Sequence, residues 1–199
     1  MYAQVTNNIQ DAVRVIREGR VVAFPTGTSY GLAVDTQQGF ALQRLRNLKK
    51  RPEEKSFTVF MKESLWQEYL ELAPGEKEAL AKYAGKALTL LVKPKMLLEH
   101  LAQEGLVGLR VIDHPLMQEL ADAVSVPLTA TSANVAGQEP CYATDCILKS
   151  FPGRIDETTY DLSLGCILDG GALSKSEPST IAKLVDGKIE VIRQGALSL

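Results

Sequence analysis

Short apolar runs alternate with segments of helical period along the whole chain, and this alternation restricts the fold more than any other sequence feature. The first such segment is "IQDAVRVI", whose apolar residues fall at helical spacing after the capping candidates Asn7 and Asn8. Gly19 is expected to close this helix. The run "VVAF" then predicts a buried strand that Pro25 stops.

The same alternation continues to the end of the chain. Further helices are predicted around 40–48, within 65–83, near 96–101, over 115–124 and near 143–149. Strands are predicted at "YGLAV", "FTVFM", "LTLLV", "VGLRVI", "PLTATS", "CILDG", "STIAKLV" and "KIEVIRQ". Interleaved strands and helices predict an α/β fold. The last strands are too close together for helical crossovers, so the sheet should be mixed. No linker-like segment divides the 199 residues, so we predict one domain over 1–199.

Charge and cysteine content exclude several classes of protein. The net charge of -2 argues against a broad basic face for nucleic acid, so any anion site should be local. Cys141, Cys146 and Cys166 form no CxxC pair, so we expect no structural zinc and an inert Cys141. With no apolar signal segment at "MYAQVTNNIQ", this cysteine usage predicts a cytoplasmic protein. The longest apolar run, "ALTLLV", is too short to span a membrane.

Cations concentrate in the segment "LKKRPEEKSFTVF". Pro52 disfavours the α region for the residue before it, so the preceding helix is expected to end near Leu48. Lys49 and Arg51 would then lie in an extended stretch and point to one side, with Lys50 pointing away. Two interpretations stay open, because such a cluster suits a bound anion but also a solvated helix C-terminus.

Small polar residues follow two predicted strands. The stretch "FPTGTSYGL" brings Thr28 and its neighbours to a strand end, where open α/β sheets usually bind ligands. The stretch "PLTATSANVAGQEP" does the same for Ser132 and Asn134, which would face one side if extended. Hydroxyl and amide groups bind nucleotides, but they also build ordinary turns.

Two arginines interrupt apolar strands, Arg110 in "VGLRVI" and Arg193 in "IEVIRQ". A guanidinium on a buried strand needs a partner. That partner is either an internal carboxylate, such as Asp113 or Asp169, or the carboxylate or phosphate of a ligand.

The usual catalytic signatures are absent from the sequence: no phosphate-binding GxxxxGK[ST] loop, no dinucleotide fingerprint and no nucleophile triad. His114 precedes a helix that begins at Pro115, so capping or packing is expected for it. If the protein is an enzyme, positioning and electrostatics should dominate its chemistry.

Together these segments resemble the YrdC/TsaC family of threonylcarbamoyl-AMP synthases, in a short single-domain form. The matching stretches, in order, are "VVAFPTGTSYGL", "LKKRPEEKSFTVF", "LTLLV", "VGLRVIDHPL", "PLTATSANVAGQEP" and "ILDGGALSKSEPSTIAKLVDGKIEVIRQGA". The resemblance implies an open, strongly twisted mixed sheet with a cationic concave face. It implies a nucleotidyltransferase that joins L-threonine, bicarbonate and ATP into threonylcarbamoyl-AMP with release of pyrophosphate, usually with Mg²⁺. The product feeds a tRNA adenosine modification that involves tRNA and other threonylcarbamoyl-transfer proteins.

The resemblance also assigns residues by position. Lys49 and Arg51 would be catalytic. ATP would be held by Lys49, Arg51, Lys55, Ser132, Asn134, the backbone near Pro140, and Arg193. Threonine would be held by Thr28, Arg110 and Ser179. No protein metal ligands are implied.

The chain departs from the family pattern on the amino-acid side of the pocket. Gly27 stands where the family usually has glutamate, "YAGKA" replaces a W-P-G-P-like stretch, and Phe60 stands where some longer members have a histidine that contacts threonine. Two alternatives therefore stay open: a paralogue resembling YciO that binds or hydrolyses threonylcarbamoyl-AMP, and a non-catalytic protein that binds tRNA or double-stranded RNA.

Overall fold

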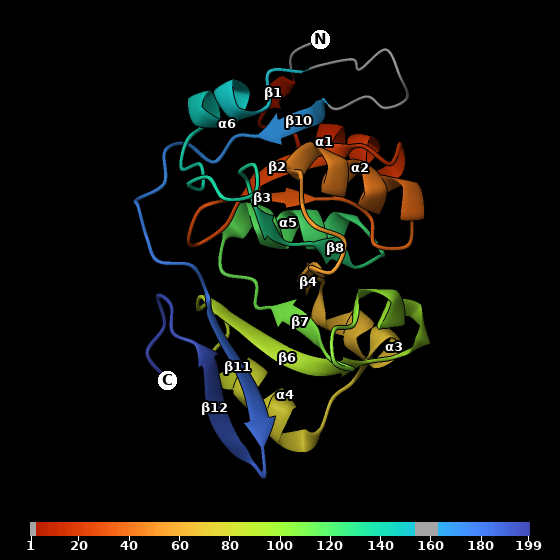
Figure 1. Cartoon of the computed structure of the whole chain (residues 1–199), viewed down its shortest axis with the longest axis vertical. Helices are drawn as coiled ribbons and strands as arrows, with labels where there is room; N and C mark the ends of the chain where they lie inside the picture. The colour runs from red at the N-terminus through yellow and green to blue at the C-terminus, as the bar shows by residue number, and fades with distance from the viewer. Residues whose placement is uncertain (1–2, 154–162) are drawn as a thin grey trace.

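The computed structural model describes residues 3–153 and 163–199, so residues 1–2 and 154–162 of the predicted 1–199 domain lie outside its description. Its strands form two sheets, one above the other in Figure 1. The first sheet has the order β1 (Gln4–Thr6), β10 (Leu164–Leu168), β2 (Val21–Pro25), β3 (Tyr30–Ala33) and β9 (Thr131–Ser132). The second has the order β12 (Lys188–Arg193), β11 (Thr180–Val185), β6 (Leu88–Pro94), β7 (Val107–Arg110), β4 (Val59–Phe60) and β8 (Leu128–Thr129), with β5 (Leu70–Glu71) paired to β6.

Both sheets mix parallel and antiparallel pairs, which confirms the predicted mixed α/β fold. In the first sheet β1, β10 and β2 are parallel and β3 is antiparallel to β2. The sheets meet at residues 128–132, because this stretch pairs with β4 through β8 and then with β3 through β9. The Thr129 backbone N–H also donates to the Val34 carbonyl at 3.0 Å, which ties the sheets together at this point.

The helices are α1 (Ile9–Arg17), α2 (Gly39–Lys49), α3 (Trp66–Tyr69), α4 (Pro74–Lys82), α5 (Pro115–Ala123) and α6 (Thr144–Ser150), with 3-10 turns η1 (Glu63–Leu65) and η2 (Met96–Leu101). The predicted N-cap of α1 is confirmed at Asn8, whose Oδ1 accepts the Gln10 backbone N–H at 3.0 Å. His114 caps α5 in the same way through Nδ1, as expected, at 3.2 Å from the Leu116 nitrogen.

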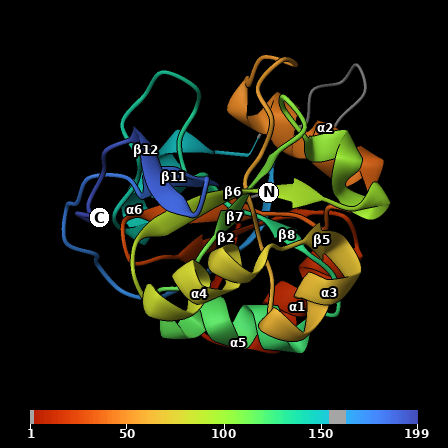
Figure 2. The ribbon, with the colours of Figure 1, turned by 90° about the horizontal axis from the view of Figure 1, so that it is seen from below.

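Strand β2 is buried on both faces, and its alternating residues enter two different apolar clusters. Val22 and Phe24 pack with α1 and α5, whereas Val21 and Ala23 share the other cluster with α2. Figure 2 shows α1 beside α5 on one side of the molecule and α2 on the opposite side. The cluster that contains α2 also includes apolar residues of β6 and β7, so one core joins the two sheets.

Two arrangements were not foreseen from the sequence. Strand β1 was not predicted, because three residues with a single apolar side chain are too short a stretch to indicate a strand. Strand β10, near the end of the chain, inserts between β1 and β2. Within the described residues, no helix is long and apolar enough to cross a membrane.

Candidate active site

Residues from both sheets line a cavity of about 650 Å³, called the central cavity below. The predicted site residues on its wall are Thr28, Arg51, Arg110, Ser132, Pro140, Ser179 and Arg193. The predicted residues Lys49, Lys55 and Asn134 are not on this wall. The wall carries four cationic side chains, those of the three arginines just named and of Lys175, and two acidic ones, Glu139 and Glu177. Positive side chains are therefore in excess on the wall.

The turn between β2 and β3 forms one side of the cavity through side-chain hydroxyls. Thr26 Oγ1 donates to the Ser29 carbonyl at 2.7 Å and accepts the Thr28 backbone N–H at 3.2 Å. Both threonines are buried, and their hydroxyls lie 3.2 Å apart. These internal bonds fix the turn, so its hydroxyl groups reach a ligand from a rigid support.

Lys49 lies elsewhere than the sequence predicted. Helix α2 continues through Lys49 and is closed by Lys50, whose φ of 50° is left-handed, so Lys49 and Arg51 do not share one extended stretch. The Lys49 side chain is 2% exposed, and its Nζ donates to the carbonyl oxygens of Ser132 at 2.5 Å and Asn134 at 2.8 Å. Burial, with a smaller effect from Arg51, lowers the pKa of Lys49 to about 7. Lys49 therefore supports the 132–134 segment, whereas Lys50 is exposed as expected.

Arg51 reaches the central cavity from a loop that folds around it. Its Nη2 donates to the Ser56 carbonyl at 2.5 Å and its guanidinium lies over the Phe57 ring, 5.0 Å from the centroid. Arg46 also contacts this ring and donates to the Lys55 carbonyl at 3.1 Å. The guanidinium of Arg51 is thus held in place while part of it stays open to the cavity. Lys55 contributes its carbonyl here, and its side chain is exposed.

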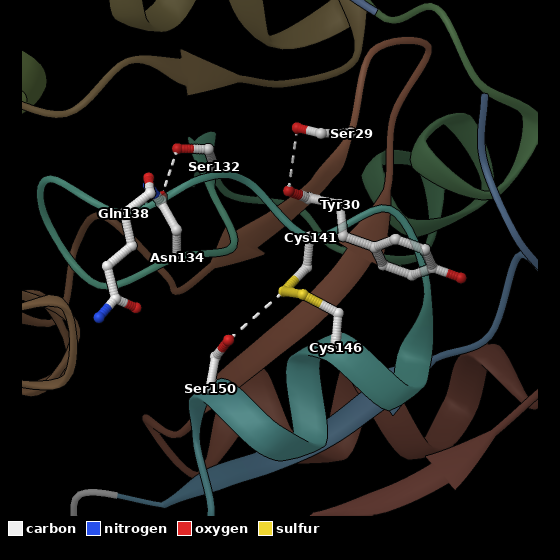
Figure 3. Close-up of a disulfide and its surroundings, with 8 residues drawn as sticks. All are labelled: Ser29, Tyr30, Ser132, Asn134, Gln138, Cys141, Cys146 and Ser150. Carbon is white, nitrogen blue, oxygen red and sulfur yellow. Dashed lines mark hydrogen bonds between the residues drawn. A yellow bond between two sulfur atoms is a disulfide. The ribbon is translucent and has the colours of Figure 1, made fainter. Parts of the chain in front are cut away.

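Ser132 and Asn134 lie side by side, as their spacing predicted. Ser132 Oγ donates to Asn134 Oδ1 at 2.6 Å, and Asn134 Nδ2 donates to the Gln138 carbonyl at 2.5 Å (Figure 3). Because the Asn134 amide closes its own loop, Ser132 is the member of the pair that faces the central cavity.

Cys141 forms a disulfide with Cys146 at the start of α6, a pairing that the sequence analysis did not predict (Figure 3). The sequence showed only five-residue spacing, and the fold brings the two Cα atoms to 5.5 Å. The Cys141 carbonyl accepts the Tyr30 backbone N–H at 2.9 Å. The disulfide therefore fixes α6 to the loop that carries Pro140. Cys166 is free and buried, and burial raises its pKa to about 12.

Arg110 pairs with Asp113, the internal carboxylate that one of the two open interpretations predicted. Its Nη2 donates to Asp113 Oδ2 at 2.5 Å, in a pair whose side chains are 6% and 3% exposed, and it also lines the central cavity. Burial lowers the pKa of Arg110, and Asp113 opposes this shift. Arg193 donates to the Ser179 carbonyl at 2.7 Å instead of to Asp169. Ser179 Oγ lies 2.8 Å from Thr89 Oγ1. These contacts hold Arg193 and Ser179, two of the predicted ligand-binding residues, on the wall of the central cavity.

Phe60, the residue at the family's histidine position, belongs to the core. It is fully buried in β4 and stacks on Phe24 with ring centroids 5.0 Å apart. It does not line the central cavity.

Sequence reasoning missed several residues on the cavity wall. Tyr30 was assigned only to a strand, yet its hydroxyl accepts the Gly170 N–H at 2.9 Å and donates to the Gly171 carbonyl at 2.8 Å. Tyr142 and Lys175 also line the cavity. Lys175 could have been noticed, because it is the cation in the quoted stretch "GGALSKSEPST".

Within the described residues, no group of three or more His, Cys, Asp or Glu side chains could hold a metal ion. One carboxylate on the cavity wall, Glu139, is exposed and lies 3.8 Å from Lys175.

Comparison with known proteins places this geometry in a family. A family model described as "Telomere recombination", for Sua5, YciO and YrdC proteins, matches residues 14–195. The chain belongs to the Sua5/YciO/YrdC family. The resemblance inferred from the sequence is therefore confirmed.

Members of the Sua5/YciO/YrdC family match the chain nearly throughout. The threonylcarbamoyl-AMP synthase of Vibrio vulnificus (strain YJ016) is 30% identical over 200 residues, covering 96% of this chain and 100% of that protein. The crystal structure of P. abyssi Sua5 complexed with L-threonine superposes with a TM-score of 0.81 at 25% identity, over 98% of this chain but 57% of that one. E. coli YciO superposes with a TM-score of 0.78 at 24% identity, over 98% of this chain and 94% of that one, and shares the fold.

Proposed function

We propose that this protein is an L-threonylcarbamoyladenylate synthase that converts L-threonine, bicarbonate and ATP into threonylcarbamoyl-AMP and pyrophosphate. One observation carries the proposal: Arg51, Arg110 and Arg193 converge with Ser132 and Thr28 on a single cavity of about 650 Å³. ATP and bicarbonate are anions and threonine brings a carboxylate, so the three substrates need such a set of cations and hydroxyls. The relative from Vibrio vulnificus, named as a synthase, and the P. abyssi Sua5 complex with L-threonine support it.

The proposed site has two sides. ATP would lie along Arg51, Ser132, Pro140 and Arg193, and Lys175 would add a further phosphate contact. Threonine would bind near Thr28, Ser179 and Arg110, with its carboxylate on the arginine, since guanidinium binds carboxylate in a bidentate way. Lys49 would act by holding the 132–134 segment against the nucleotide, and Lys55 would add charge from outside the wall.

The reaction suits a site without a protein nucleophile. The uncharged threonine amine attacks the bicarbonate carbon and forms a carbamate with loss of water, and a carbamate oxygen then attacks the α-phosphorus of ATP while pyrophosphate leaves. Bicarbonate, the carbamate and ATP are all anions, so alignment and charge neutralisation supply the rate enhancement. Arg51 is the best-placed residue for charge on the phosphates, because Ser56 and Phe57 fix its guanidinium.

Mg²⁺ would enter with ATP. When bound, it neutralises phosphate charge and favours departure of pyrophosphate. On the protein side, the Glu139 carboxylate and the hydroxyl of Ser132, two of the oxygen donors on the wall of the central cavity, would hold the ion.

The product would pass to tRNA with the help of other threonylcarbamoyl-transfer proteins, in the cytoplasm. The disulfide between Cys141 and Cys146 is unusual for this compartment, since disulfides rarely persist in a reducing cytoplasm. The reduced form of Cys141 and Cys146 should therefore be assayed alongside the oxidised form.

The decisive assay measures pyrophosphate release from ATP and Mg²⁺ with and without L-threonine plus bicarbonate. We expect release that depends on both co-substrates, and mass spectrometry should detect threonylcarbamoyl-AMP. Folded protein that releases no threonine-dependent pyrophosphate would contradict the proposal. Hydrolysis of added threonylcarbamoyl-AMP without synthesis would favour the paralogue instead, and tight duplex RNA binding independent of Arg51 would favour the RNA-binding protein.

A further inference from the structure

One buried carboxylate connects the two sheets beside the central cavity. Asp113 follows β7 of the second sheet, and its Oδ1 accepts the Gly27 backbone N–H, from the β2–β3 turn of the first sheet, at 3.0 Å. Its Oδ2 accepts from Arg110 Nη2 at 2.5 Å. The Asp113 side chain is 3% exposed and that of Arg110 is 6% exposed, so the ion pair lies in a poorly solvated place where charge interactions are strong, whereas Gly27 is exposed.

Gly27 is the residue that makes room for this carboxylate. A Cβ atom added at Gly27 would lie 2.5 Å from Asp113 Oδ2 and 2.7 Å from its Cγ, closer than nonbonded atoms approach. Neither group can shift freely, because the Asp113 carboxylate is bonded at both oxygens and the turn is closed by Thr26 and Ser29. Any side chain at position 27 should therefore displace Asp113 from Arg110.

The pairing changes what Arg110 can bind. A guanidinium has five N–H donors, and Arg110 gives one to Asp113 and one to the Leu88 carbonyl at 3.2 Å. Donors remain for a ligand in the central cavity, yet the pair as a whole is neutral. Arg51 and Arg193 donate to backbone carbonyls in the bonds described above, and their charge is not cancelled in this way. A multiply charged phosphate should therefore bind more tightly to Arg51 and Arg193. A carboxylate has a single negative charge and should still bind at Arg110, where the positive field is weaker.

We propose that Asp113 is a positioning and specificity residue that, with Gly27, reserves Arg110 for the substrate carboxylate and excludes phosphate from that end of the cavity. This inference rests on the proposed function for the identity of the carboxylate, which is that of threonine. The neutralisation of Arg110 and the need for glycine at position 27 are independent of it.

The first test is Asp113→Asn, which can keep the acceptor for the Gly27 N–H and removes the charge opposite Arg110. Inorganic phosphate is the probe. We expect calorimetry to show phosphate binding at least 10-fold tighter in Asp113→Asn than in the unmodified protein, and phosphate to become competitive with threonine while the KM for ATP changes less than about 2-fold. Asp122→Asn, a carboxylate change on the exposed face of α5, should alter neither quantity. Unchanged phosphate affinity in folded Asp113→Asn would overturn the proposal.

The second test does not depend on whether Asp113→Asn folds, because Gly27→Ala keeps Asp113 and is compared with Gly39→Ala, where an added Cβ meets nothing within 4 Å. Gly27→Ala is introduced alone and together with Asp113→Ala. Gly27→Ala should raise the KM for threonine at least 10-fold when Asp113 is present and less than about 2-fold in Asp113→Ala, because the clash has gone. Equal effects of Gly27→Ala and Gly39→Ala, or equal effects of Gly27→Ala in both backgrounds, would refute the steric coupling.

The two proposals fail in different ways. If the unmodified protein releases no threonine-dependent pyrophosphate, the synthase proposal fails, and the same four proteins are compared by phosphate calorimetry and thermal denaturation. Gly27→Ala should then lower Tm with Asp113 present and leave it nearly unchanged without Asp113. Additive shifts in Tm would overturn the inference whatever the protein catalyses.

Discussion

Arg51 is the residue whose removal should affect turnover most. Its guanidinium is held by Ser56 and Phe57, and the charge it places in the cavity has no nearby substitute in that loop, since Lys55 points to solvent. We expect Arg51→Ala to reduce kcat/KM for threonine-dependent pyrophosphate release about 100- to 1000-fold, as loss of one preorganised donor does in other enzymes. Arg17→Ala removes an exposed cation of α1 and serves as the control. A loss below about 10-fold for Arg51→Ala would mean that other cations hold the phosphates.

Lys49 should give the folding stability a measurable pH dependence. Its pKa is lowered to about 7 in the folded protein, against an ordinary value of 10.5, so between these values the unfolded chain binds more protons. The free energy of unfolding should therefore rise with pH from about 7 to 10, by up to about 1.4 kcal/mol per pH unit. Urea unfolding at several pH values checks this against Lys49→Met, which lacks the titrating group. Parallel curves for the two proteins would show that Lys49 keeps an ordinary pKa.

Helix α1 offers a test of its cap, because two neighbouring asparagines differ in role. Asn8 accepts the Gln10 N–H, while the exposed Asn7 lies one residue outside the cap. Asn8→Ala should lower the free energy of unfolding by about 1 kcal/mol. Asn7→Ala should change it by less than about 0.5 kcal/mol. Urea denaturation of both variants measures the difference, and equal effects would contradict the assigned cap.

The disulfide should stabilise the loop and α6 as one unit. Closing the six-residue loop from Cys141 to Cys146 stabilises the fold by about 2 kcal/mol in the chain-entropy treatment. We expect dithiothreitol to lower the free energy of unfolding by this amount and to raise the KM for ATP, because the loop carries Pro140. Cys146→Ser should be insensitive to dithiothreitol. A stability independent of reductant would contradict the bond.

At the scale of the whole molecule, net charge sets what large partners can bind. With 22 Lys and Arg against 24 Asp and Glu, the surface lacks the excess of cations that holds a nucleic acid by counterion release. We expect a short RNA duplex to show no binding tighter than about 1 μM at 150 mM salt by fluorescence anisotropy. Binding with a nanomolar Kd would favour the RNA-binding alternative.

Local patterns predicted most of the elements, and contacts between distant segments explain what they missed. The helical period of residues 9–16 and the apolar run "VVAF" correspond to α1 and β2, because each pattern reflects burial of that element alone. The partner choice of β10 and the disulfide depend on which segments meet in space, which no local pattern encodes.

The candidate site shows the same division. Arg51 and Ser132 reach the cavity as their segments suggested. Lys49 is buried because helix α2 continues through it and Lys50 adopts the left-handed conformation that ends the helix. The preference of Pro52 for an extended preceding residue did not predict this helix end. The pairing of Arg110 with Asp113 was one of two open alternatives, and only the folded chain decides it.

The insertion of β10 between β1 and β2 has a consequence for synthesis on the ribosome. The chain from Thr26 to Ser163 must be made before β10 exists, about 140 residues that take roughly 7–28 s at about 5–20 residues per second. During that interval β2, which is apolar on both faces, has an unpaired edge. We expect this edge of the nascent chain to stay open to chaperones until the last fifth of the protein emerges.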